Sequence, residues 1–521
     1  MLKKIKYGSA FVVVAFLFIF SAKATAFAQV GDMGFFGGIS EGRRLPRTTE
    51  TLLVQNSGTS PRSNNRSTFN YTELTFLSGR PAEFKGLIDI NTSGGVVDGT
   101  ATGTFNVGYR VYQSPGAADS DTIINRTANF SVAYRVEGTQ EIMTYDVVKS
   151  TWREVITTPE DTFTLDPRQS EYIISIIRDR TPGVDYYRGD FSGRLVYVSA
   201  GGDTTVVDQH GSFYGYNCVW SRTETHRMSV SIMNDAWALQ YEIRPSVTVN
   251  KILQYTRNEP TAISFEGNYK EVLQNFSGLK YDIYVKPLFM WDEPDFGGLS
   301  IETINNFEQL PEPDLSFLVG DASEDDIRRL FAMRILDGEP KYYQPGQLIT
   351  RGQFMTALAK AIKLPIEQAP APRANARNRQ PVTTYLFNDV SSLRPEYPYI
   401  MAIYKAGIAS GREGGSFDFD KPIMRQEAFA TLVRALGLVR LAPNPTTVTV
   451  FTDDAQIASW AKRELSAANT IGLIMPDANG RIYPERQITK GEAASLFNIL
   501  IEYMRHGLVS DYAERIVNFA Q

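Results

Sequence analysis

Three short segments of the sequence place a basic residue where a helix is expected to begin. The segments are LITRGQF, PIMRQEAF and QITKGEAA, and their basic residues are Arg351, Arg425 and Lys490. A cation in the first turn of a helix is unfavourable by about 0.3–1 kcal/mol, because the helix dipole is positive there. Unpaired first-turn amides beside a cation can, however, bind a carboxylate or phosphate. The pattern therefore predicts either an anion site at each helix start or a cation that pairs with a carboxylate of the chain itself.

The neighbouring residues predict the helices that position these cations. Thr350-x-x-Gln353 and Thr489-x-x-Glu492 fit the capping box, in which the threonine side chain bonds a first-turn amide, so the basic residue takes the first helical position. Met424 stands at the cap position of the middle copy. Small or apolar residues follow at offsets 3, 7 and 11 from each cation: Phe354, Leu358 and Ile362; Ala428, Leu432 and Leu436; Ala493, Phe497 and Ile501. We expect one buried helical face in three copies.

The segments upstream of the cations repeat as well. FNDV at Phe387 corresponds to FTDD at Phe451, and an aromatic element precedes each cation, in YYQPGQLIT, SFDFDKPIM and RIYPERQIT. Each unit is predicted to be helix, loop and helix in about 55 residues. Because one such unit cannot cover its own apolar stripe, we expect the three units to pack together.

The N-terminal half has a different texture, with short runs of Val, Ile, Thr, Tyr and Phe between Gly, Asn, Asp and Pro. In TFNVGYRVY, alternate residues share one face, and RLVYVSAGGDTTVV reads as two strands around a Gly-Gly turn. We therefore predict an all-β domain over residues 29–305, either an antiparallel sandwich or a barrel-like fold, followed by an all-α C-terminal part.

Composition and the N-terminus restrict the functional class. Residues 1–28 resemble a secretory signal peptide, with three lysines, a short apolar run and small residues before a cleavage position after Ala28. The signal peptide predicts export, and because no later stretch is apolar enough to cross a membrane, we expect no membrane span after its cleavage. A net charge of -5 argues against nucleic acid as a partner. The single cysteine, Cys218, excludes an intramolecular disulfide framework.

The repeated segments resemble a known family. ITRGQ, IMRQE and ITKGE are similar to the ITRAE signature of S-layer homology (SLH) modules, and FNDV and FTDD are similar to that family's FxDV opening. The resemblance implies a bundle of three modules whose grooves bind an acidic secondary cell wall polymer, often pyruvylated, on Gram-positive bacteria. The residues that fall on the family's ligand-binding positions are Arg351, Arg425, Lys490, Asp389, Asp453 and Trp460.

This resemblance also divides the C-terminal half. Modules are expected over residues 315–365, 384–440 and 448–505, with linkers at 306–314 and 366–383 and a tail at 506–521. The first module lacks the FxDV opening, the second has Met424 in place of threonine, and the third carries lysine in place of arginine. These departures predict unequal polymer binding at the three sites.

The sequence of the β domain is also compatible with other functions. His210, Cys218 and His226 are evenly spaced and could be metal ligands, although a structural role is the alternative. We predict no metal site, cofactor or catalytic residue, because no nucleophile, zinc-protease or phosphate-loop motif is present. The predicted function is a cell-surface protein anchored to the wall, whose β domain is a structural or binding module that self-assembles into a surface layer or remains separate. The alternative is an SLH-anchored exocellular hydrolase acting on polysaccharide.

Overall fold

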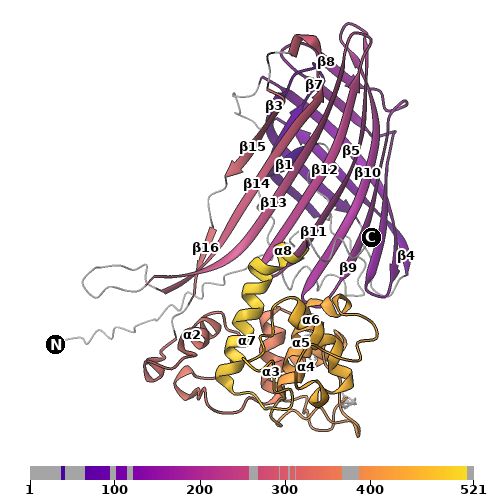
Figure 1. The fold of residues 1–521 in the computed structure, drawn as a ribbon. Coiled ribbons are helices and arrows are strands. Elements are labelled where there is room, and N and C mark those ends of the chain that lie inside the picture. The colour runs from indigo at the N-terminus through magenta and orange to yellow at the C-terminus, as the bar shows by residue number, and fades with distance from the viewer. Residues whose placement is uncertain are drawn as a thin grey trace, which may run out of the picture.

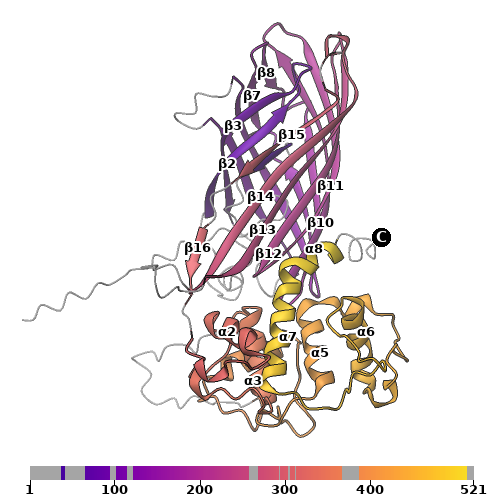
Figure 2. The same ribbon diagram turned by 60° about the vertical axis from the view of Figure 1, so that its left-hand side comes forward.

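The computed structural model describes residues 37–40, 65–93, 101–113, 121–256, 268–290, 292, 294–302, 306–310, 313–366 and 386–512. The predicted signal peptide and nearly all of the predicted linker at 366–383 lie outside these ranges. The described chain forms a long β domain with a compact helical domain at one of its ends (Figure 1, Figure 2). Among the described helices, none combines the length and the hydropathy needed to cross a membrane.

The strands of the described residues form one antiparallel sheet. Most strands pair with their neighbours in sequence, while β7 and β8 form a short hairpin between β5 and β10, and β16 pairs with β14. Their bounds are β1 Gly38–Ser40, β2 Asn65–Thr75, β3 Ala82–Ser93, β4 Thr102–Tyr112, β5 Ile123–Glu137, β6 Gln140–Val147, β7 Arg153–Thr157, β8 Thr162–Leu165, β9 Glu171–Arg180, β10 Val184–Ser199, β11 Thr204–Cys218, β12 Ser221–Met233, β13 Ala238–Thr256, β14 Asn268–Val285, β15 Phe296–Glu302 and β16 Asn306–Gln309.

The sheet rolls around one large apolar core. Gly37, just before β1, lies against Met228 on β12 and Ile243 on β13. The first strand of the sheet therefore lies close to strands near its opposite edge. Figure 2 likewise shows β2 and β15 on the same side of the domain. The all-β prediction is confirmed, and the strands form one rolled sheet where a sandwich would have two packed sheets.

Alternation along the strands decides which side chains fill the roll. On β4 the four residues predicted to share a face are all buried, namely Phe105, Val107, Tyr109 and Val111. On β10, Gly189 and Gly193 face inward, where an added Cβ would lie 2.4 Å from the ring of Phe213 and 2.3 Å from the ring of Tyr172. Glycine is needed at these positions because large aromatic rings from neighbouring strands cover them.

The predicted Gly-Gly turn is also present. It joins β10 to β11, whose pairing runs from Val184 opposite Cys218 to Val198 opposite Thr204. Gly202 has a φ of 93°, a conformation that residues with a Cβ rarely adopt.

The helical domain contains three long helices and three shorter ones that precede them. Their bounds are α2 Glu324–Ala332, α3 Arg351–Ala361, α4 Tyr397–Lys405, α5 Arg425–Leu436, α6 Lys462–Thr470 and α7 Lys490–Glu502, and the short α8 Leu508–Asp511 follows the π-helical turn η7 Tyr503–Gly507. Each long helix packs on the first helix of the next unit: α3 on α4, α5 on α6, and α7 on α2. The nine residues predicted to form the repeated face are all buried.

The β domain contacts the C-terminal ends of all three long helices, where backbone carbonyl groups lack partners within the helix. Side chains of the β domain donate hydrogen bonds to these carbonyls and to one in the π-helical turn after α7: Trp220 to Ala361 (2.9 Å), Tyr186 and Thr181 to Leu436 (3.0 and 3.3 Å), and Ser221 to Met504 in η7. The backbone amide of Gly183 also donates to the carbonyl of Ala435, at 2.7 Å. The two domains are therefore joined by a specific, buried interface.

The packing of two segments differs from the predicted domain boundaries. The start of the predicted linker at 306–314 forms β16, which pairs with β14 and so belongs to the sheet. The start of the predicted tail at 506–521 forms α8 and contributes Tyr512 to the interface, where its hydroxyl donates to the carbonyl of Tyr187 at 2.6 Å and its ring stacks on Tyr186. Local sequence does not reveal either contact, because the β14 residues paired with β16 lie beyond β15 and the partner of Tyr512 is 325 residues away.

Candidate functional site

The three helix starts meet at the end of the helical domain that lies away from the β domain (Figure 1). Backbone hydrogen bonds run from the amide of Ile349 to the carbonyl of Ile488 (3.1 Å), from Ile488 to Ile423 (3.3 Å) and from Ile423 to Ile349 (3.2 Å). We call this closed set the isoleucine ring. Because each of its members stands two residues before a basic residue, the ring places the three cations at equivalent positions around one centre.

The first-turn amides of the long helices already have partners. The amides of the three basic residues donate to carbonyls of a neighbouring unit: Arg351 to Lys421, Arg425 to Arg486 and Lys490 to Gln347, each at 2.8 Å. In α3 and α7 the predicted capping boxes are present, with the threonine side chain accepting from the third helical amide at 3.2 Å. The expectation that first-turn amides are unpaired was therefore wrong. An anion at these helix starts would be bound by the side chains of the basic residues.

Arg351 is the most enclosed of the three cations, with 6% of its surface exposed. Its guanidinium donates to Glu427 Oε1 at 3.2 Å and to the carbonyl of Ser410 at 3.0 Å, and it lies 5.0 Å from the ring centre of Phe417. Burial, together with the nearby charge of Arg412, lowers the pKa of Arg351 to about 10, which leaves it charged at neutral pH. At this position the cation pairs with a carboxylate of the chain itself.

Arg425 and Lys490 are only partly buried and are therefore more accessible to solvent than Arg351. The guanidinium of Arg425 lies 5.3 Å from the ring centre of Phe429, and its Nε has no hydrogen-bond partner within the described part of the chain. Burial lowers the pKa of Arg425, the charge of Arg486 lowers it further, and Glu492 opposes both. The ammonium of Lys490, whose pKa burial also lowers, donates to the neutral side chain of Gln347 at 2.5 Å.

The two predicted aspartates have a structural task. Asp389 accepts backbone hydrogen bonds from Phe417 (2.6 Å) and Phe419 (2.9 Å), and Asp453 accepts them from Ile482 (3.1 Å) and Tyr483 (2.7 Å). Each aspartate therefore holds the segment that leads to the next cation. Because those carboxylate oxygens are engaged by backbone amides, these two residues position the site in this structure.

Trp460 is 44% exposed and lies beside the guanidinium of Arg434, 5.8 Å from its ring centre. Arg434 in turn donates to Glu464 at 2.6 Å, so this group joins α5 to α6. Trp460 therefore presents an exposed aromatic face between two units, and no contact joins its ring directly to Arg425 among the described interactions.

Sequence reasoning missed the residues that surround the cations. Phe417 contacts Arg351 and Tyr343 contacts Lys490, at 5.0 and 5.6 Å from ring centre to cation, and both aromatic residues belong to the neighbouring unit in the ring. The signal was present, because both stand eight residues before a basic residue. Which cation each ring serves depends on the order of units around the isoleucine ring, which a sequence does not display.

The alternatives for the β domain find little support in the described chain. His226 lies inside the roll, hydrogen-bonded to Glu224 at 2.8 Å, while Cys218 lies at the interface with the helices. No group of three or more metal-ligating side chains occurs among the described residues, and these include His210.

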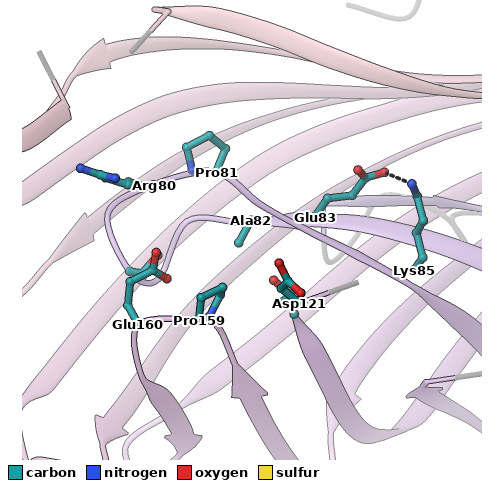
Figure 3. Close-up of a pocket in the computed structure, with 10 residues that line it drawn as sticks. Arg80, Pro81, Ala82, Glu83, Lys85, Asp121, Pro159 and Glu160 are labelled. Atoms are coloured by element: carbon teal, nitrogen blue, oxygen red, sulfur yellow. Dashed lines mark ion pairs between the residues drawn. The ribbon is translucent and has the colours of Figure 1, made fainter. Parts of the chain in front are cut away.

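A hollow of about 270 Å³ lies at the far end of the roll, between the β2–β3 and β7–β8 turns, and Figure 3 shows the residues that line it. Its carboxylates come from Glu83, Asp121 and Glu160, and all three residues are exposed. A glycosidase needs one sheltered carboxylic acid beside a second carboxylate. This open, mixed-charge hollow does not provide that pair.

Comparison with known proteins finds a matching family for part of the helical domain. The family model of the S-layer homology domain matches residues 386–429 and 450–494. Among the relatives, an amylopullulanase of Thermoanaerobacterium thermosulfurigenes is 27% identical over 184 residues, which is 34% of this chain and 9% of the relative. The exoglucanase XynX of Acetivibrio thermocellus is 27% identical over 182 residues, 34% of this chain and 15% of the relative.

A relative of a different kind is an S-layer protein of Bacillus thuringiensis subsp. finitimus, which is 27% identical over 171 residues, 33% of this chain and 19% of the relative. The chain thus spans less than a fifth of the length of each of these relatives. The matched residues contain both aspartates that hold the site, two of the three cations and Trp460. This chain therefore carries two S-layer homology domains, at residues 386–429 and 450–494, which assign it to the outside of the cell in association with the cell wall.

Proposed function

We propose that the helical domain holds the protein on the cell wall by binding an acidic, pyruvylated secondary cell wall polymer through Arg351, Arg425 and Lys490. The observation that carries this proposal is the placement of three cations at equivalent positions around the isoleucine ring, at the end of the molecule opposite the β domain. Trp460 contributes an aromatic face of the kind on which a sugar ring packs. The β domain is displayed outward as a structural or binding module.

The proposal includes a third module over residues 315–365. Its support is geometric, because α3 begins with a capping box, packs on α4 of the next unit and joins the isoleucine ring in the same way as α5 and α7. The relatives add a second argument, since their alignments of 171 to 184 residues are longer than the span from 386 to 494. Modules 384–440 and 448–505 complete the anchor.

The three cations should contribute unequally. Arg351 is held by Glu427 and Ser410, whereas the guanidinium of Arg425 lies over Phe429 and makes no ion pair within the described chain, and Lys490 faces a neutral amide. We expect Arg425→Ala to weaken polymer binding most, by about 10- to 150-fold, because a charge-assisted contact contributes about 1.5–3 kcal/mol. Linked sites compensate for one another on whole walls, so the triple substitution should release the protein.

The test is co-sedimentation with purified wall sacculi, with thermal denaturation of each variant as the folding check. Lys405→Ala, an exposed cation at the end of α4, is the matched control and should still sediment. Sacculi from which the secondary polymer has been extracted should bind none of the proteins. Arg351→Ala alone should also lower the free energy of unfolding, by about 1–3 kcal/mol, because it leaves the buried Glu427 with fewer partners. A folded triple variant that still sediments would contradict the proposal.

A further inference from the structure

A second polar site lies on the outer surface of the β domain, far in sequence from the helical domain. A hollow of about 430 Å³ spans β2 to β5 and the β6–β7 turn, within the size range of ligand pockets of about 300–1,000 Å³. Its polar lining consists of amide, hydroxyl and guanidinium groups with one carboxylate: Asn91, Asn106, Asn129, Ser93, Thr127, Thr151, Arg66, Arg110 and Asp89.

The hollow exists because the middle strand has no side chain at its centre. Gly108 on β4 faces outward, and a Cβ added there would lie 2.6 Å from Asn129 Oδ1 and 3.9 Å from the carbonyl of Asn91. The amide of Asn129 therefore lies across the floor of the hollow. Glycine in the interior of a strand weakens it and often marks a place where another molecule approaches the backbone closely.

Three of the polar groups are held in fixed orientations by their neighbours. The Nδ2 of Asn129 donates to Thr151 Oγ1 at 3.0 Å, which leaves its Oδ1 facing Gly108. The guanidinium of Arg110 lies 4.8 Å from the ring centre of Tyr112. Groups that are already oriented lose less entropy when a ligand binds, which is a property of built binding sites.

The second guanidinium of the hollow, that of Arg66, is held by the buried carboxylate of Asp89. Asp89, which is 4% exposed, accepts hydrogen bonds from Arg66 and from Thr68 Oγ1, the latter at 2.6 Å. The hydroxyl of Tyr112 reaches the same carboxylate at 3.4 Å. Because Asp89 is committed to these donors, the two arginines leave the hollow with one excess positive charge.

We propose that this hollow binds a carboxylate-bearing sugar, either free or as a unit of an acidic polysaccharide. The carboxylate pairs with Arg110, which, unlike Arg66, makes no ion pair within the described chain, and the hydroxyl groups of the ring exchange hydrogen bonds with the amides of Asn91, Asn106 and Asn129. Arg66, which Asp89 holds beside Tyr112, supplies a further donor to the ring. The site is independent of the isoleucine ring and of the anchoring function.

The experiment is isothermal titration calorimetry of the full chain with trigalacturonate, galacturonate and the neutral trisaccharide maltotriose. Gly108→Val fills the floor of the hollow and Arg110→Gln removes the charge. Both should weaken binding of the acidic sugars by about tenfold or more, the loss expected for a charge-assisted contact. The variants should stay folded, because the new Cβ meets only the end of the Asn129 side chain, whose one bond to Thr151 is exposed and replaceable by water, and because valine favours strands.

Thr104→Val, on the outer face of the same strand but outside the hollow, is the matched control and should bind like the unchanged protein. Binding of trigalacturonate without galacturonate would assign the site to the polymer, and binding of both would include the free sugar. The proposal is overturned if no acidic sugar binds, if maltotriose binds equally well, or if folded Gly108→Val and Arg110→Gln proteins bind as tightly as Thr104→Val.

Discussion

At the scale of single residues, the three long helices differ in their N-terminal caps. Thr350 and Thr489 accept hydrogen bonds from the third amide of α3 and α7, while Met424 has no acceptor to offer α5. The backbone at Met424 is nevertheless the same, with φ and ψ of -84° and 152° against -78° and 157° at Thr350. The middle copy therefore has the geometry of a capped helix without the side chain that completes it.

Met424→Thr should raise the free energy of unfolding by about 0.5–2 kcal/mol, because threonine restores a first-turn hydrogen bond in a backbone already suited to it. Met424 is 39% exposed, so little packing is lost. Chemical denaturation measures the effect, and Met424→Val, which has the β-branched shape without the hydroxyl, is the control. A Met424→Thr midpoint at or below that of Met424→Val would show that the cap hydrogen bond does not form.

At the scale of elements, no helical unit is complete by itself. The apolar face of each long helix is covered by the first helix of the following unit, and α7 returns to α2 of the first. The rings of Phe354 on α3 and Phe497 on α7 also meet in the middle, with 4.7 Å between their centres. Removing any one unit therefore exposes faces on both of its neighbours.

A chain that ends at residue 450 should lose helical structure beyond the part removed. It lacks α6 and α7, which leaves α5 and α2 without their partners and opens the isoleucine ring. We expect residues 313–450 of this chain to show little protection in amide hydrogen exchange and no cooperative helical melt. Protection of α3 and α5 equal to that in the full chain would show that the units fold separately.

At the scale of the whole molecule, the β domain and the helical domain share a buried interface. The ends of α3, α5 and α7 all contact β-domain donors, and Trp220 is 1% exposed between the cations of Lys363 and Arg505, which lie 5.7 and 4.8 Å from its ring. The cation end of the helical domain consequently faces away from the roll in a fixed orientation (Figure 2). An anchor built this way displays the β domain rigidly.

The two domains should therefore unfold in a single calorimetric transition. Replacing two interface donors together, in Tyr186→Phe with Ser221→Ala, removes one hydrogen bond each from the carbonyls of Leu436 and Met504, which keep the longer ones from Thr181 (3.3 Å) and the Cys218 thiol (3.6 Å), at a cost of about 0.5–1.5 kcal/mol per lost bond. We expect this variant to melt at lower temperature and in two steps. Ser229→Ala, a partly buried serine on the same strand, should change neither property. Two resolved transitions in the unchanged protein would contradict the coupling.

The sequence by itself determined the features that depend on local spacing. The capping residues, the start of each long helix at a cation, the repeated buried face and the alternation along the strands are set by residues within a few positions of one another. The tertiary structure decided which groups those residues meet. Arg351 pairs with Glu427 of the next unit, Asp389 bonds backbone amides, and Trp220 caps a helix 141 residues away. These partners depend on how units close around a ring and how a sheet rolls, and both are packing outcomes of the whole chain that no local pattern records.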